Sequence, residues 1–358
     1  MRLAILSRDA PPTPGGIADH TARLAGSLAI AGDEVTLVTR SPVDGVPGVT
    51  VLSHPGFDKA PAKTLAGRLI ESDPEVIIWA YNPFSYGAKG LARKGPKIAR
   101  AIKGASTARL VVLAHELWFP PGREGARGML WRLSQRKAGL DVFRTADRVI
   151  VTTPQRVAEL AAEGISAVRI PVGSNLPDGA LPLPRTELGV PDDAFLLGHL
   201  GGLGPGHDLQ VGLSAIEGIQ QAHLLLLGDT GPLPELPERV HTTGRVPADF
   251  AAGALAACDA YLHLDHVGPT PGRRTALAAA LQAGLPIIAF DGEQTDTSLM
   301  DAYLLSSEIS DTALEATIRT AMEQPDIRAA CAIAAKAYFD RELTWTRITE
   351  AVRSVCKG

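Results

Sequence analysis

The stretch RLAILSRDAPPTPGGIADHTARLAGSLAIAGDEVTLVT, residues 2–39, predicts the fold of this chain. Two short apolar runs, 2–7 and 34–39, have the length and composition of buried parallel strands. The region between them, 17–31, has a helical pattern and follows a pair of glycines. A strand, a helix and a second parallel strand form the unit from which doubly wound α/β sheets are built. The sequence therefore predicts such a sheet from its first residues.

The same alternation of short apolar runs and helical segments continues along the chain. In the first half, strands are predicted at 75–80, 109–115 and 148–153, with a helix at 154–163. After residue 191, strands are predicted at 194–200, 222–228, 239–244, 259–264 and 286–290. The proline- and glycine-rich segment between the two halves, 171–191, has no period and is expected to be a linker.

We therefore predict an α/β protein with two Rossmann-like, doubly wound domains that face each other across a cleft. The expected N-terminal domain covers 1–172, the linker 173–191, the C-terminal domain 192–340, and a final helical segment 341–358. Ligands of open α/β sheets bind at the carboxyl ends of the strands, so the cleft is the expected ligand site.

Composition and charge exclude several classes of protein. The chain has 358 residues and a formal net charge of -4, which argues against a nucleic-acid binder. It contains three cysteines without metal-ligand spacing, so we expect a reducing cytoplasm. The sequence has no D-x-D motif and no cluster of His and Cys, so we expect no bound metal, and no cofactor is expected either. No uninterrupted apolar stretch is long enough to span a membrane.

The order of short motifs resembles the GT-B glycosyltransferases of family 4, along nearly the whole chain. The residues that carry the resemblance are PPTPGGIADHTARLAGSLAIAGDEVTLVT, LAHELWF, RVIVTTPQRVAEL, IPVGSNLP, HLGGLGPGHDL, LLLLGDTGP, VHTTGRVP and LTWTRITEAVRSV. The resemblance implies a retaining transfer of a sugar from a nucleoside-diphosphate sugar, with UDP or GDP as the nucleotide, to an acceptor hydroxyl or amine. It also implies that the final helix folds back onto the first domain.

The chain departs from the family where the donor usually binds. The Arg and Lys of the family's GRLxxxKG loop align with Gly202 and His207, and its two glutamates align with Pro271 and Ala279. One alternative is therefore a non-catalytic homologue that binds a ligand or a partner transferase. Another is a Rossmann oxidoreductase or nucleotide-sugar epimerase, which is weakened because SRDAPPTPGG is not a G-x-G-x-x-G loop.

Candidate site residues of the first domain lie at predicted strand ends and at a helix start. Gly15 and Gly16 open the first helix, where backbone N–H groups can approach an anion, or they form an ordinary turn. His115 ends a predicted strand and is either catalytic or structural, and Glu116 either positions an acceptor or caps its loop. For the acceptor side the expected residues are His20, Tyr81, Asn82 and Trp118, with loop packing as the alternative for the 81–90 segment.

On the donor side, Arg273 and Arg274 occupy an unusual position. Thr270 and Pro271 have the pattern of an N-cap and a first helical residue, so a helix is predicted to begin there with both arginines in its first turn. Cations are unfavourable at a helix N-terminus, so either an anion lies between these arginines or they are solvated. We favour a donor diphosphate held by both guanidinium groups.

The resemblance implies further residues on the donor side. Expected phosphate-binding residues are Gly201, Gly202, His207 and Thr275, and expected nucleotide-binding residues are Gly228, Thr243, Gly244 and Arg245.

The segment 123–137 mixes basic residues, among them Arg127, Arg132, Arg136 and Lys137, with apolar ones. It either contacts an anionic membrane surface or an anionic acceptor, or it is a solvated helix whose apolar stripe faces the core.

Overall fold

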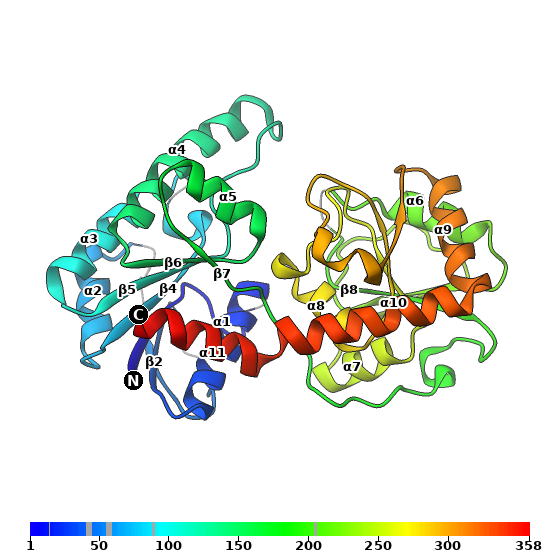
Figure 1. Cartoon of the computed structure of the whole chain (residues 1–358), viewed down its shortest axis with the longest axis horizontal. Coiled ribbons are helices and arrows are strands. Elements are labelled where there is room, and N and C mark those ends of the chain that lie inside the picture. Colours follow the sequence, from blue (N-terminus) through cyan, green and yellow to red (C-terminus); the bar gives the residue numbers. More distant parts are fainter. Residues whose placement is uncertain (14, 41–44, 55–58, 88–89, 204–205) are drawn as a thin grey trace. The chain divides into compact units, whose positions relative to one another are not determined.

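The computed structural model describes residues 1–13, 15–40, 45–54, 59–87, 90–203 and 206–358 (Figure 1). The chain divides into two compact units. The first unit comprises Met1–Pro171 together with Trp345–Gly358, and the second comprises Val172–Thr344.

The first unit is built on a parallel sheet of seven strands in the order β3-β2-β1-β4-β5-β6-β7. The strands are β1 (Arg2–Leu6), β2 (Glu34–Thr39), β3 (Val49–Ser53), β4 (Val76–Tyr81), β5 (Arg109–Ala114), β6 (Arg148–Val151) and β7 (Val168–Arg169). In the register of the sheet, Leu3 of β1 lies between Val35 of β2 and Val76 of β4. The chain thus winds outward in both directions from β1, which creates a switch point between β1 and β4.

Helices cover both faces of this sheet (Figure 1). They are α1 (Gly16–Ile30), α2 (Ala62–Ile70), α3 (Gly95–Ala105), α4 (Gly125–Thr145), α5 (Pro154–Ala162) and α11 (Trp345–Lys357), with a 3-10 turn η1 (Pro83–Tyr86). Alternate residues of β1 enter different cores: Ala4 packs with α2, α3 and α4, whereas Leu3 packs with α1 and α11. The final helix therefore completes the core of the first unit, where Ile348 is buried.

The second unit repeats this plan with a parallel sheet of six strands in the order β10-β9-β8-β11-β12-β13. The strands are β8 (Phe195–Leu200), β9 (Ala222–Leu227), β10 (Val240–Gly244), β11 (Ala260–His263), β12 (Ile287–Phe290) and β13 (Tyr303–Ser306). The helices α7 (Ala248–Ala256), α8 (Thr275–Gln282) and α10 (Pro325–Tyr338) cover one face, and α6 (Leu209–Glu217) and α9 (Asp311–Glu323) cover the other. The switch point lies between β8 and β11.

The prediction of two doubly wound, Rossmann-like sheets is confirmed. Predicted strand 34–39 coincides with β2, and the other predicted strands overlap observed ones, whereas β3, β7 and β13 were not predicted. The segment 173–191, predicted as a linker, belongs to the second unit, because Leu188 and Val190 are buried in its core. Among the residues that the structure describes, no helix is long and apolar enough to cross a bilayer.

Candidate functional site

At the carboxyl edge of the first sheet, two histidine rings meet. His115 directly follows β5, and its backbone N–H donates to the carbonyl of Tyr81 at 3.0 Å. The ring of His20, from α1, approaches the His115 ring edge to face with centroids 5.0 Å apart. The indole of Trp345, at the start of α11, packs against His20 at 5.3 Å. The structure thus brings together His115, predicted as catalytic, and His20, predicted for the acceptor side.

Both histidines are neutral at neutral pH because they are buried. Burial lowers the pKa of His20 to about 4. Burial also lowers the pKa of His115 well below its usual value, and the neighbouring His20 and Arg156 lower it further. Within the described part of the chain, His20 Nδ1 and His115 Nε2 have no hydrogen-bond partner. Each ring therefore keeps one buried nitrogen whose hydrogen-bonding capacity the described residues leave unused.

Arg156, from the first turn of α5, holds the segment that carries His115 and Glu116. Its guanidinium donates to the His115 carbonyl at 2.6 Å and to Thr152 Oγ1 at 2.8 Å. It also forms an ion pair with the Glu116 carboxylate at 2.5 Å. Arg156 was not among the predicted site residues. Its 40-residue separation from Glu116 in the chain becomes a contact because α5 follows β6, the neighbour of β5 in the sheet.

Gly15 and Gly16 lie at the N-terminus of α1, as predicted. Gly15 is the N-cap residue with φ 152°, a backbone conformation that favours glycine, and no side chain caps the helix. A Cβ atom at Gly15 would meet nothing within 4 Å, so its backbone is open to a ligand.

Two expected acceptor-side residues lie in the core instead. Tyr81 is 0% exposed and packs its ring against Trp79, Tyr86 and Phe143, and burial raises the pKa of its hydroxyl. Trp118 is buried in the same core. Their large rings fill the space between sheet and helices, so the expectation that they line an acceptor pocket is wrong. Asn82 caps η1 by accepting from the Phe84 N–H at 2.9 Å.

The carboxyl ends of β8, β9 and β10 bring four predicted donor-side residues together. Gly201 donates its N–H to the carbonyl of Leu227 at 2.9 Å. Gly228, the next residue, donates to Thr243 Oγ1 at 3.2 Å and forms a β-bridge with Gly244. Gly201, Gly228 and Gly244 all have positive φ angles, at 94°, 88° and 60°. The neighbouring Gly202 also lies on this edge, and Arg245 is exposed and lies 3.7 Å from Asp229.

The helix predicted to begin at Pro271 begins four residues later. Pro271–Arg273 form a separate 3-10 turn, Arg274 is extended with φ −119° and ψ 108°, and α8 starts at Thr275. The prediction that both arginines occupy the first turn of the alanine-rich helix is therefore wrong. The reason lies in a long-range contact of Arg274.

Arg274 forms an ion pair with Asp265, a buried carboxylate that follows β11. Despite the desolvation that opposes ionisation, the Arg274 guanidinium holds the pKa of Asp265 below its usual value. An anion does therefore accompany Arg274, and it is supplied by the chain itself. Arg273 donates to Gln294 Oε1 at 3.0 Å.

A stack of buried rings supports this ion pair from the sheet. The rings of His199, Tyr261 and His263 are stacked, with centroids 5.9 Å and 6.4 Å apart. Burial lowers the pKa of His199 to about 4, and burial and Arg274 lower the pKa of His263. His207 joins the group through a β-bridge to Asp265 and an edge contact with His199 at 6.1 Å. His199 and His263 are therefore neutral rings beside the Asp265–Arg274 pair.

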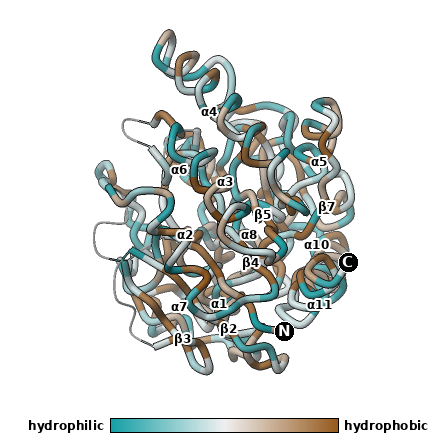
Figure 2. The backbone as a smooth tube through the Cα atoms, turned by 90° about the vertical axis from the view of Figure 1, so that its left-hand side faces the viewer, coloured by the Kyte–Doolittle hydropathy of each residue, from teal (hydrophilic) through white to brown (hydrophobic). Residues whose placement is uncertain are grey.

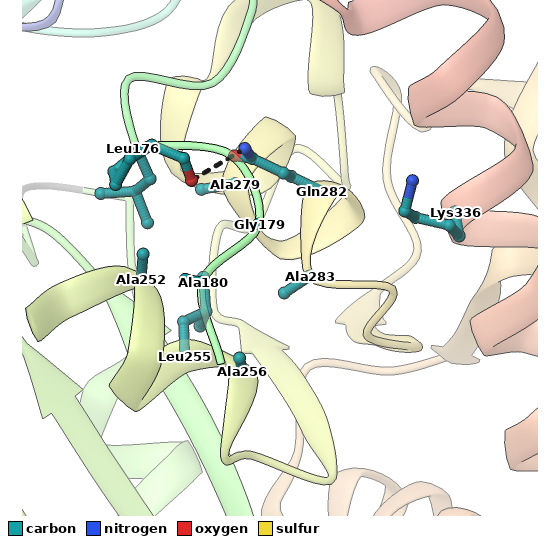
Figure 3. Close-up of a pocket in the computed structure, with 11 residues that line it drawn as sticks. Leu176, Gly179, Ala180, Ala252, Leu255, Ala256, Ala279, Gln282, Ala283 and Lys336 are labelled. Atoms are coloured by element: carbon teal, nitrogen blue, oxygen red, sulfur yellow. Dashed lines mark hydrogen bonds between the residues drawn. The ribbon is translucent and has the colours of Figure 1, made fainter. Parts of the chain in front are cut away.

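A separate cavity of about 230 Å³ lies in the second unit, between the 176–180 segment and the helices α7 and α8 (Figure 3). Its lining is mostly alanine and leucine, and Gln282 donates to the carbonyl of Pro177 at 3.2 Å. Ala279, which aligns with a family glutamate, lies in this apolar lining. No predicted site residue lines the cavity.

Among the described residues, no group of three or more His, Cys, Asp or Glu side chains is arranged to hold a metal ion.

Comparison with known proteins identifies the family of the first unit. Residues 15–175 match the model of the glycosyl transferase 4-like domain, so this part of the chain is a glycosyltransferase domain of that type. No curated protein is similar in sequence.

Solved structures share the fold over the whole chain. Sucrose-phosphate synthase from Thermosynechococcus elongatus is 18% identical with a TM-score of 0.78, covering 100% of this chain and 98% of its own. WaaG, a glycosyltransferase of lipopolysaccharide biosynthesis, is 17% identical with a TM-score of 0.71, covering 99% and 100%. HepE from Anabaena in complex with UDP-glucose is 18% identical with a TM-score of 0.74, covering 100% and 99%. The two units therefore have the GT-B glycosyltransferase fold.

Proposed function

We propose that the protein is a retaining glycosyltransferase that moves a sugar from a nucleoside-diphosphate sugar, with UDP or GDP as the nucleotide, to an acceptor hydroxyl or amine. The glycosyl transferase 4-like domain at 15–175 supports sugar transfer as the reaction class. A structural neighbour, HepE, has been solved with UDP and with UDP-glucose, which supports a donor of this kind.

The observation that carries the donor assignment is the ion pair of Arg274 with Asp265. The Arg274 side chain is 37% exposed, and Asp265 engages one end of its guanidinium. No other hydrogen bond of this guanidinium to a described residue is found, so the remaining N–H groups can bind phosphate oxygens. Because Asp265 is buried, it holds Arg274 in one orientation. Arg273, one residue earlier, supplies a second positive charge on the same loop.

In the proposed reaction, the bond between the sugar C1 and the departing phosphate oxygen breaks while C1 bonds to the acceptor oxygen or nitrogen. The acceptor's proton passes to the leaving phosphate on the same face of the sugar, which retains the configuration. Arg273 and Arg274 stabilise the charge that develops on the diphosphate, and no metal ion takes part.

In the first unit, neutral His115 donates or accepts a hydrogen bond at the sugar. Glu116, held by Arg156, positions the acceptor.

One observation favours a second function, a non-catalytic homologue that binds a ligand. Four charged positions of the family are occupied by Gly202, His207, Pro271 and Ala279, and the last of these lies in an apolar lining.

A thermal-shift panel of UDP-, GDP- and ADP-sugars and NAD(P) tests these functions. The proposal expects a UDP- or GDP-sugar to raise the melting temperature, followed by release of the nucleoside diphosphate when acceptors are supplied. Stabilisation without release across an acceptor panel supports the non-catalytic homologue. Stabilisation by NAD(P) alone contradicts both.

A further inference from the structure

The first half of α4 exposes apolar side chains on the face that points away from its own unit. Met129, Leu130 and Leu133 are 66%, 58% and 62% exposed. With Ala126 and Lys137 they follow helical spacing and form one continuous stripe. On the opposite side of the helix, Gly128 and Gln135 are buried. The expectation that the apolar stripe of 123–137 faces the core is therefore wrong for these three residues.

Basic residues border this apolar stripe on both sides. Segment 123–137 contains five basic residues and one acidic residue, Glu124, in a chain whose net charge is -4. Helical geometry places Arg127 on one border of the stripe and Arg132 and Arg136 on the other. Arg136 forms an ion pair with Glu163, whereas Arg123 and Lys137 are exposed and neither has an ion pair with a described residue. Positive charge is thus concentrated around the exposed apolar side chains.

An aromatic cluster fixes the base of this helical segment. The rings of Phe84, Phe119 and Trp131 contact one another at centroid distances of 5.2 to 6.1 Å. The guanidinium of Arg127 lies 4.3 Å from the Trp131 ring. The N-terminal turns of α4 extend beyond the other helices of the first unit, and Figure 2 shows brown and teal residues alternating along them (Figures 1 and 2). The stripe is therefore presented on a supported, projecting helix.

We propose that this stripe, residues 126–137, docks the protein on an anionic lipid bilayer. Apolar side chains flanked by arginine and lysine match the boundary between acyl chains and negatively charged headgroups. A second copy of the chain fits less well, because antiparallel pairing of two stripes would bring Arg127 of one copy toward the basic residues 136 and 137 of the other. The inference goes beyond the proposed function and does not depend on it.

Vesicle flotation of the full chain tests this inference. Wild-type protein is expected to float with vesicles of equal parts phosphatidylcholine and phosphatidylglycerol, and to bind vesicles of phosphatidylcholine alone far more weakly. Raising the salt from about 0.1 M to about 1 M, which shortens the Debye length from about 10 Å to about 3 Å, is expected to weaken binding.

Two variants separate the apolar and the electrostatic contributions. The triple change Met129→Ser, Leu130→Ser and Leu133→Ser is expected to lower the partition coefficient roughly tenfold or more, because the inserted apolar area is lost. The double change Arg123→Gln and Lys137→Gln is expected to lower it on anionic vesicles only. The matched control changes three other exposed apolar residues, Ile30→Ser, Leu181→Ser and Ile333→Ser, and is expected to bind like wild type.

Three outcomes overturn the inference. If wild-type protein does not float with anionic vesicles, the anionic bilayer is not its partner. If the triple variant and the matched control lose vesicle binding equally, the stripe is not the docking surface. A lipid-free dimer, seen by light scattering and lost in the triple variant, assigns the stripe to self-association. Melting temperatures of all variants show that each one is folded.

Discussion

The carboxylate of Asp265 binds the guanidinium of Arg274, nine residues later in the chain. Asp265 follows β11 and is buried, whereas Arg274 precedes α8 and is partly exposed. This pair explains why α8 does not begin at Pro271: Arg274 leaves helical geometry to reach Asp265. It also holds a cationic side chain at the carboxyl edge of the second sheet, where α/β proteins bind ligands.

Replacing Arg274 by alanine is expected to destabilise the protein by about 1–3 kcal/mol, because a buried carboxylate loses its partner. An unpaired arginine at a helix N-terminus would show the opposite effect, a small gain from relief of the dipole contact. Urea denaturation measures the difference. Arg273→Ala, which removes a bond to the neutral amide of Gln294, is the matched control and is expected to cost less. A larger loss for Arg273→Ala than for Arg274→Ala would show that Asp265 is not the important partner.

His115→Ala is expected to lower turnover of the nucleotide sugar by about 10²-fold or more while changing nucleotide affinity little. The reason is that the proposal gives His115 a role at the sugar and leaves the donor phosphates to other residues, among them Arg273 and Arg274. Turnover is followed by release of nucleoside diphosphate, and affinity by calorimetry. His223→Ala, at the start of β9, serves as a histidine control. If His115→Ala keeps wild-type turnover, the ring is structural.

Gly201→Ala is expected to weaken nucleotide binding in addition to its effect on stability. Gly189→Ala is the matched control, because both glycines have positive φ angles, 94° at Gly201 and 69° at Gly189. Alanine is therefore strained at both positions, at a cost of roughly 1 kcal/mol. A Cβ atom at Gly201 meets no protein atom within 4 Å, but it would occupy space beside a bound phosphate. Calorimetry on Gly201→Ala and Gly189→Ala separates the two effects. Equal affinity in the two variants would remove Gly201 from the site.

Acid is expected to destabilise the first unit through His20. Its pKa is about 4 in the folded protein and near 6.5 when unfolded. Between these values the unfolded chain binds more protons, so the free energy of unfolding falls as pH falls, by up to about 1.4 kcal/mol per pH unit for this group. His115 adds to the slope in the same direction.

Urea denaturation of His20→Gln between pH 7 and pH 4 tests the assignment. The variant is expected to have a shallower dependence on pH, whereas Ile30→Ser, on the same helix, keeps the wild-type dependence. An unchanged slope in His20→Gln would mean that His20 is not buried as a neutral ring.

Much of the fold could be predicted because strand and helix patterns are local. The run 34–39 coincides with β2, and the glycines at 15 and 16 lie at the start of α1 as predicted. Side-chain positions were predicted less well where they depend on partners distant in the chain. Tyr81 was assigned to a loop, but its ring is needed to fill the space between β4 and α4.

Asp265 and Arg156 belong to the candidate site but were not predicted, and only one of them has a signal in the sequence. Asp265 directly follows a buried strand, the same signal that pointed to His115, and could have been found in that way. Arg156 gives no such signal, because its contact with Glu116 depends on β5 and β6 being neighbours. The start of α8 was misplaced because the local pattern of Thr270 and Pro271 does not reveal the ion pair between Asp265 and Arg274.

Calorimetric titration of wild type and Arg274→Ala with UDP and GDP tests the proposed donor site most directly. Wild type is expected to bind one of the two nucleotides, and Arg274→Ala to bind it about ten- to a hundredfold more weakly, since each decade corresponds to about 1.4 kcal/mol. Lysine at position 274 is expected to restore binding only in part, because it lacks the planar fork. Arg341→Ala, an exposed arginine of the same unit that also pairs with a carboxylate, is expected to bind like wild type. Failure of the wild type to bind either nucleotide, or equal affinity in wild type and Arg274→Ala, would contradict the proposed donor site.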